Sequence, residues 1–179
     1  MRNKISNLIK RIAQLEEEMT KGLEGQDLSG QDFSRWDLRN TDLSEARLRG
    51  ANLSYANLSY ANLYKAQLYN ANLTGANLKH ADLKDAILEG ANLENANLKD
   101  ANLKDANLYA SNLKFANLKG ADLSGAFLED ADLEGANLED VDLTRAEIWY
   151  IDLSFATYNS KTKLPFDEQE ARSRKMIKK

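Results

Sequence analysis

Residues 51–60 read ANLSYANLSY, which is one five-residue unit written twice. Leucine recurs at every fifth position from Leu28 to Leu153, with Phe33 and Ile148 as the only replacements, so the chain holds 26 consecutive units without an insertion or a deletion. Alanine usually lies two residues before the leucine, and Asn or Asp usually lies between them. An internal repeat of this length decides the fold of most of the chain.

A period of five fits neither the 3.6-residue α-helix nor the two-residue alternation of a strand. In an extended segment, residues two apart point the same way, so the alanine and the leucine both face inward and the residue between them faces outward. The remaining two residues of each unit must turn a corner, so that the next alanine points inward again. The repeat therefore predicts a coil with one flat side and one corner per unit, filled by small and large apolar side chains in alternation.

The outward position between alanine and leucine indicates how many sides a coil has. Its occupants that are neither Asn nor Asp are Arg47, Gln67, Ile87, Phe127 and Glu147. All five are separated by multiples of twenty residues, which is four units. The exceptions stack on one face of a four-sided coil, and 26 units make about six and a half coils in a rod about 31 Å long.

The unit Ala-Asn/Asp-Leu-x-x, as in ANLSY at residues 51–55 and ANLKD at residues 101–105, resembles the pentapeptide repeat family. The resemblance covers residue 26 to about residue 158. It implies an all-β solenoid, a right-handed quadrilateral parallel β-helix of about six to seven coils. It implies less about function: most members have no assigned biochemical activity, a subset resembles DNA and acts on DNA gyrase, others are regulatory interaction modules, and many come from cyanobacteria.

The first 25 residues predict an amphipathic cap helix that ends near Gly22. We expect it to cover the first coil of a repeat domain at residues 26–158. The alternative is a short coiled coil that joins two chains, so the protein is predicted to be a monomer or a dimer through residues 1–21. The apolar stripe of this helix consists of Ile5, Leu8, Ile12, Leu15 and Met19.

Residues 159–179 lack the repeat and form a basic C-terminal tail. Pro165 interrupts the chain, and Asp167 followed by Glu170 is typical of a capping box, so a short helix is expected from about residue 168. The last basic side chains are expected to form a frayed, solvated tail, with a hook for an acidic partner as the alternative. These side chains are Arg172, Arg174, Lys175, Lys178 and Lys179.

Reactive side chains are scarce in this sequence. It has no cysteine and a single histidine, His80, and it has no phosphate-binding or calcium-binding motif. Since 26 units run without an insertion, there is little loop from which to build a pocket. We therefore expect no enzyme, no catalytic residue, no cofactor and no metal. No apolar run approaches the ~20 residues of a membrane span, and no secretory signal is evident, so a cytoplasmic protein is expected.

The chain has a formal net charge of −4, which argues against direct nucleic-acid binding. Residues 26–158 alone carry 12 basic and 21 acidic side chains, a net charge of −9. An acidic rod could mimic DNA and act on DNA gyrase or another DNA-binding protein. Lysines interrupt the acidity over the middle coils, so DNA mimicry is the alternative hypothesis and not the preferred one.

The preferred hypothesis is a non-catalytic, rigid module that binds another, unidentified protein. Its candidate interface is the side that lacks Asn and Asp, where apolar and aromatic residues are expected to point outward. This side could instead be covered by a terminal segment or simply tolerate substitution. We call it the variable face, and it comprises Arg47, Arg49, Gln67, Tyr69, Ile87, Glu89, Tyr109, Phe127, Glu129, Glu147 and Trp149.

Overall fold

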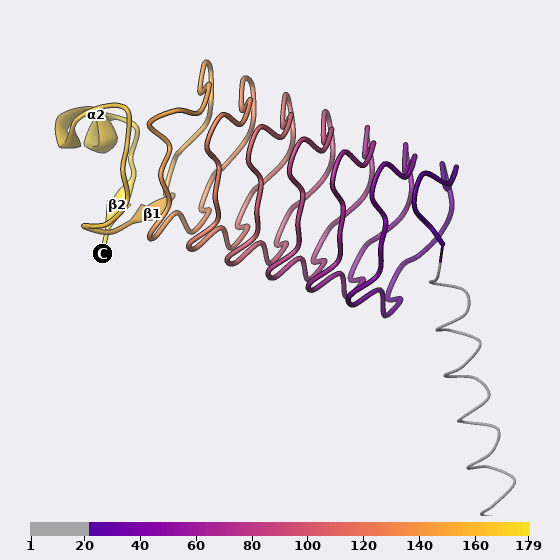
Figure 1. Cartoon of the computed structure of the whole chain (residues 1–179). Helices are drawn as coiled ribbons and strands as arrows, with labels where there is room; N and C mark the ends of the chain where they lie inside the picture. Colours follow the sequence, from indigo (N-terminus) through magenta and orange to yellow (C-terminus); the bar gives the residue numbers. More distant parts are fainter. Residues whose placement is uncertain (1–21) are drawn as a thin grey trace, which may run out of the picture.

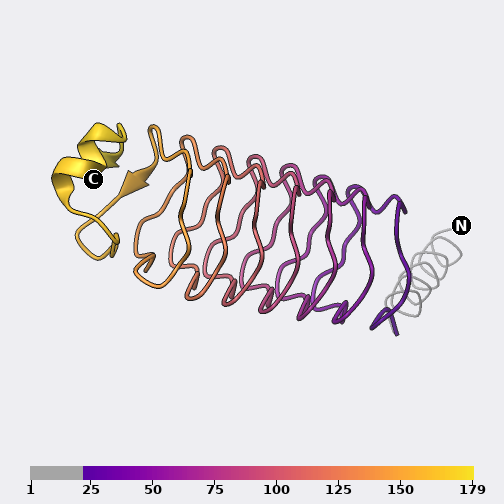
Figure 2. The same ribbon diagram turned by 90° about the horizontal axis from the view of Figure 1, so that it is seen from above.

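The computed structural model describes residues 22–179 and is a right-handed quadrilateral β-helix, as predicted (Figure 1). The coils stack into one rod, and the C-terminal segment lies beyond the last coil (Figure 2). The predicted N-terminal cap helix and its possible role in dimerisation fall on residues that lie outside the described ones. Within residues 22–179 the helical part is confined to one short segment, and nothing there has the length and apolar character that a membrane-spanning helix needs.

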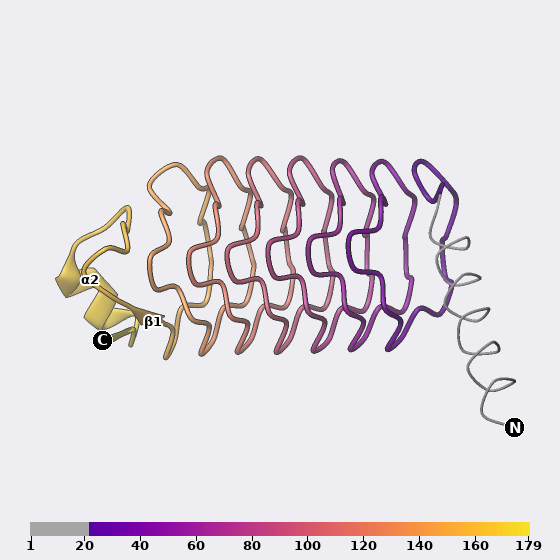
Figure 3. The same cartoon turned by 60° about the horizontal axis from the view of Figure 1, so that its bottom comes forward.

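Successive coils are joined by parallel backbone hydrogen bonds between residues about twenty apart, and Figure 3 shows the stacked coils from another side. Arg47 bridges Gln67, and Gln67 in turn bridges Ile87. The N–H of Leu48 donates to the carbonyl of Gln67 at 2.8 Å, and this bond recurs at the leucine of most units. The twenty-residue coil predicted from the five exceptions is therefore confirmed.

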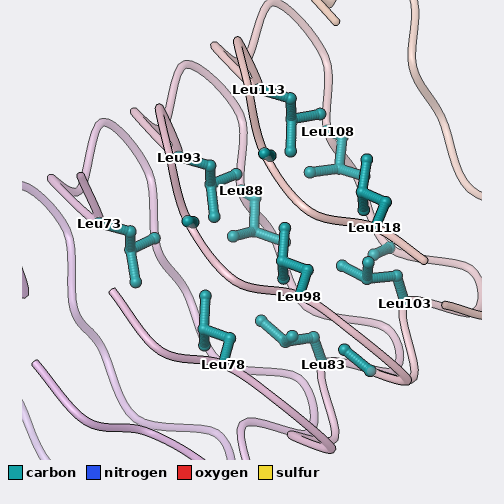
Figure 4. Close-up of a cluster of buried hydrophobic side chains, with 14 of the residues drawn as sticks. Leu73, Leu78, Leu83, Leu88, Leu93, Leu98, Leu103, Leu108, Leu113 and Leu118 are labelled. Carbon is teal, nitrogen blue, oxygen red and sulfur yellow. The ribbon is translucent and has the colours of Figure 1, made fainter. Parts of the chain in front are cut away.

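The interior is made of alanine and leucine alone over most of the rod. Leucines from successive units point inward and form continuous columns (Figure 4). Leu53, Leu73 and Leu93 have no accessible surface, and neither have Ala56 and Ala76. Because alanine follows leucine around each coil, large and small side chains alternate and fill the narrow interior.

Each corner is a tight turn with a fixed chirality. The N–H of Ala51 donates to the carbonyl of Leu48 at 3.0 Å, and the second residue of the corner, Gly50, has φ +63°. A positive φ at this position is characteristic of a type II turn and is favourable for glycine. Many corners nevertheless hold another residue, such as Ala110 with φ +52° or Phe115 with φ +57°.

The Asn or Asp of each unit holds the corner that follows it. The side-chain oxygen of Asn52 accepts a hydrogen bond from the N–H of Ser54 at 3.2 Å, and every Asn or Asp at this position from Asp27 to Asp152 does the same. Many of the asparagines also donate to the residue twenty positions earlier, as Asn72 does to Asn52 at 3.3 Å. The predicted outward orientation thus serves both the turn and the stacking of coils.

The C-terminal segment closes part of the last coil. Strand β1 (Thr157–Tyr158) is followed by helix α2 (Glu168–Ser173) and by strand β2 (Ile177–Lys178), which pairs with β1 in parallel. The register of Thr157 to Ile177 is again twenty residues, so the irregular segment occupies the length of one coil.

The expectation of a frayed C-terminal tail was wrong. Ala171 and Met176 are buried, and Leu164 and Phe166 pack against the end of the core. The apolar residues of this segment cover part of the leucine column, and this burial holds the chain end in place. The short helix is present where it was expected, with the Asp167 carboxylate accepting from the N–H of Glu170 at 2.8 Å.

Replacing Leu93→Ala should lower the free energy of unfolding by about 3 kcal/mol, because it removes a fully buried side chain and leaves a cavity that the stacked coils cannot close. Chemical denaturation measures the change. Lys104→Ala, at an exposed corner, is the control and should change stability little. Equal effects of the two substitutions would contradict the described packing.

Replacing Ala110→Gly should raise stability by about 1 kcal/mol, because the alanine Cβ opposes the positive φ of this corner. Ala106→Gly, in the neighbouring extended segment, should lower it. Thermal denaturation of the two variants separates the effects, and destabilisation by both would show that Ala110 is not strained.

Candidate functional site

The structure brings the residues of the variable face onto one wall and the corner that follows it. Parallel bridges connect Arg47 to Gln67, Gln67 to Ile87, and then Ile87 through Asn107 to Phe127. A further bridge joins the last of these to Glu147 at the end of the rod. The wall is therefore a continuous strip that runs the length of the described β-helix.

At its five exceptions this strip lacks the side-chain hydrogen bonds that hold the corners of the other three walls. Within the described chain, the N–H groups of the corner residues after its five exceptions have no hydrogen-bond acceptor, whereas the N–H of Tyr109 donates to Asn107 at 2.9 Å. The amide ladder between coils is also missing, apart from an ion pair of Arg47 with Asp27 at 3.2 Å. Each lost bond forfeits roughly 1 kcal/mol of stability, so this wall is built at a cost that the other walls avoid.

Large apolar side chains on the variable face are open to solvent. Phe127 is 44% exposed, Tyr109 is 40% exposed and Trp149 is 69% exposed. Ile87 is half-buried on the same wall, between Gln67 and Asn107. These side chains lie over the middle and C-terminal coils, which makes the strip most apolar in that half.

The polar members of the face are arranged around this apolar part. Glu89 and Glu129 are half-buried at the corner that also carries Tyr109, and Arg49 is exposed at the N-terminal end of the same corner. The negative charge of Asp130 raises the pKa of Tyr109 above its ordinary value. The face thus combines an apolar centre with polar groups at its edge.

Sequence reasoning missed three exposed aromatic residues beside the face. Tyr150 is 84% exposed at the same corner as Trp149, and Phe115 and Phe155 are exposed at the next corner. All three occupy the second corner position of their units. The signal that could have found them is an aromatic residue where the backbone has positive φ and favours glycine or asparagine.

Several acidic side chains near the C-terminal end of the rod form ion pairs with lysines. Lys114 lies 2.9 Å from Glu134, and Lys119 lies 2.8 Å from Glu139, in each case one coil apart. Hydrogen bonds and the charge of Lys119 hold the pKa of Glu139 below its usual value. This pairing reduces the continuous negative potential that a DNA mimic needs.

The single histidine has a structural contact. The imidazole of His80 lies over the ring of Tyr60 with centroids 4.8 Å apart and an interplanar angle of 29°. Among residues 22–179, no three His, Asp or Glu side chains gather closely enough to hold a metal ion.

The repeat pattern and the fold have a known counterpart. A family model for pentapeptide repeats matches in eight copies, and the chain belongs to this family. No curated protein matches the chain. The matched residues are 23–54, 51–90, 76–114, 86–125 and 111–149.

Solved structures of pentapeptide repeat proteins from cyanobacteria are similar to this chain. The protein alr5209 of Nostoc PCC 7120 is 33% identical over 57% of this chain and 84% of its own, with a TM-score of 0.54. HetL of the same strain, which is involved in heterocyst differentiation regulation, is 32% identical over 84% of this chain and 69% of its own, with a TM-score of 0.29. Rfr23 of Cyanothece 51142 is 28% identical over 87% of this chain and 98% of its own, with a TM-score of 0.39.

Replacing Ile87→Asn should leave the free energy of unfolding unchanged or raise it by about 1 kcal/mol, because the new amide can accept from the N–H of Glu89 and rejoin the ladder with Asn107. The reciprocal change Asn92→Ile removes two such bonds on the next wall and should lower stability by about 1–3 kcal/mol. Urea denaturation compares the two. Similar destabilisation by both would mean that Ile87 is needed for folding.

Proposed function

We propose that this protein is a rigid, non-catalytic module that binds another protein through the variable face. The observation that supports this most strongly is the replacement of Asn and Asp by other residue types on one wall only. That replacement gives up corner and ladder hydrogen bonds while leaving the backbone register intact. Departures from locally favourable sequence concentrate at functional sites.

The composition of the face suits a protein partner. Aromatic side chains and arginine are enriched at the centres of protein interfaces and contribute most of the binding energy there. Phe127, Tyr109 and Trp149 lie along the same strip. Tyr109 and Trp149 are at the same corner, two coils apart, and Phe127 lies on the wall of the coil between them. A flat strip of this kind can cover a partner's surface without enclosing a small molecule.

The backbone of the face is already ordered before a partner arrives. Both edges of each of its inner strands are paired with neighbouring coils by hydrogen bonds of about 2.7–3.0 Å. Since little conformational entropy is then lost on binding, a modest apolar area suffices for a specific complex. The proposed role is thus that of a stiff scaffold presenting a fixed row of side chains.

Replacing Ile87→Asn and Phe127→Asn together should abolish partner binding while the fold persists, because both changes install the residue type that the other walls carry. The partner is first isolated from a lysate of the native organism by its retention on the wild-type chain, and it is then purified. Its binding to the wild-type chain and to the variant is measured. The control is Lys79→Asn with Lys99→Asn, at the corner diagonally opposite the one that carries Tyr109 and Trp149. This control variant should bind the same partner.

Two outcomes would contradict the proposal. The first is a partner that binds the Ile87→Asn, Phe127→Asn variant as tightly as the wild-type chain. The second is inhibition or protection of DNA gyrase supercoiling by the purified protein, which would favour the DNA-mimic alternative.

A further inference from the structure

The last coil of the β-helix leaves part of its edge uncovered. Of its four walls, one is covered by strand β2 pairing with β1, and another by Lys163, whose carbonyl accepts from the N–H of Leu143 at 2.8 Å. The terminal strand of the variable face, residues 146–150, has no such neighbour on its outer side within residues 22–179. This strand is the C-terminal end of the variable face.

The outer side of this strand carries a defined hydrogen-bonding pattern. One coil earlier, the corresponding strand at residues 126–128 is paired with the terminal strand. The N–H of Glu147 donates to the carbonyl of Ala126 at 2.9 Å, and the carbonyl of Glu147 accepts from the N–H of Leu128 at 2.7 Å. The equivalent groups at the end of the rod are the carbonyl of Ala146 and the N–H of Ile148, and neither has a partner in the described chain. A further parallel strand would pair with them in the same register.

A cleft of about 580 Å³ lies over this edge. One side is the terminal strand with Ile148 and Trp149, and the other is the C-terminal segment with Phe166 and Arg174. The guanidinium of Arg174 lies 4.9 Å from the centre of the Phe166 ring and 2.8 Å from Glu170, which fixes that side of the cleft. The position of α2 beyond the last coil is visible in Figure 1.

The apolar end of the core is incompletely covered at this cleft. Ala126 and Leu128 have no accessible surface, whereas Ala146 and Ile148, at the same positions one coil later, are only partly buried. The two inward-facing side chains of an added strand would lie above these two residues. Burial of apolar surface there would favour apolar side chains at both positions.

The outward residue of an added strand would lie above Glu147. Elsewhere in this chain, a basic residue above an acidic one forms an ion pair: Arg47 lies 3.2 Å from Asp27, and Lys163 lies 2.8 Å from Asp142. Glu147 has no basic side chain within ion-pair distance among residues 22–179, so a lysine or arginine in this place would complete the same arrangement.

We propose that the open edge at residues 146–150 binds an extended segment of a partner protein as a further parallel β-strand, with the pattern apolar–basic–apolar. A second copy of this chain is a poorer occupant. A two-fold axis would pair the two edges in the antiparallel sense and would place Glu147 of each copy against the like charge of the other. This site goes beyond the face marked by Ile87 and Phe127, and it does not require them.

The probe is the peptide acetyl-Ser-Val-Arg-Val-Ser-Gly-amide, titrated into the full-length protein and followed by calorimetry and by the backbone amide signal of Ile148. We expect saturable binding below about 1 mM, with a shift of that signal. Glu147→Lys should weaken binding about tenfold, and a peptide with Glu in place of Arg should restore it. Methylation of the peptide's arginine N–H, which would donate to Ala146, should also weaken binding.

Glu129→Lys, one coil back on the same face, is the control and should leave binding unchanged, as should Ile87→Asn with Phe127→Asn. Absence of binding at about 1 mM, or binding that survives both Glu147→Lys and arginine methylation, would overturn the proposal. So would self-association of the chain that the peptide abolishes by competition, because a second copy would then be the occupant of the edge. Since the Ile87 and Phe127 variant alters the wall of the variable face and Glu147→Lys alters the open edge at its end, failure of either proposal is recognised separately.

Discussion

In every coil one backbone N–H per corner, that of the first turn residue, has no carbonyl within reach. The other N–H groups of the unit donate to carbonyls of the neighbouring coils or of the turn itself, as when Leu48 donates to Gln67. The remaining N–H is satisfied by the oxygen of the Asn or Asp two residues earlier, such as Asn52 with Ser54. This short side-chain bond explains why the outward position of the repeat is almost invariant although it does not contribute to the core.

The same bond makes the variable face conspicuous. Where Ile87 and Phe127 replace the amide, the corner keeps its geometry because the adjoining coils still pair on both sides. The wall can therefore exchange stability for surface chemistry without changing shape. Repeat proteins permit this because each unit contacts only its neighbours, so the loss of one bond is not transmitted along the rod.

Most of the fold was predictable because it depends on local, repeated contacts. The spacing of Arg47, Gln67 and Ile87 determined the number of walls, since an exception recurring every twenty residues must share a side. The grouping of the variable face followed from the same count. The exposure of Trp149 and Phe127 fits that prediction, although binding by this face is still a proposal.

The C-terminal segment could not be predicted in the same way. Residues 159–176 carry no repeat, and their position depends on the packing of Leu164 and Phe166 against the last coil. The register of β2 follows from the length of the intervening segment and from the burial of Met176, neither of which has a periodic signal. The uncovered edge at residues 146–150 is a consequence of where this segment lies, so it too was beyond sequence reasoning.

Amide hydrogen exchange measured by NMR tests most directly whether the outward Asn or Asp controls the corners. The first corner residue should exchange slowly wherever Asn or Asp precedes it, as at Tyr109, and quickly after each exception, as at Glu89 and Glu129. Slow exchange at Glu89 and Glu129, equal to that at Tyr109, would show that the corners hold without this bond. The variable face would then carry no cost in stability, and the main support for its role in binding would be lost.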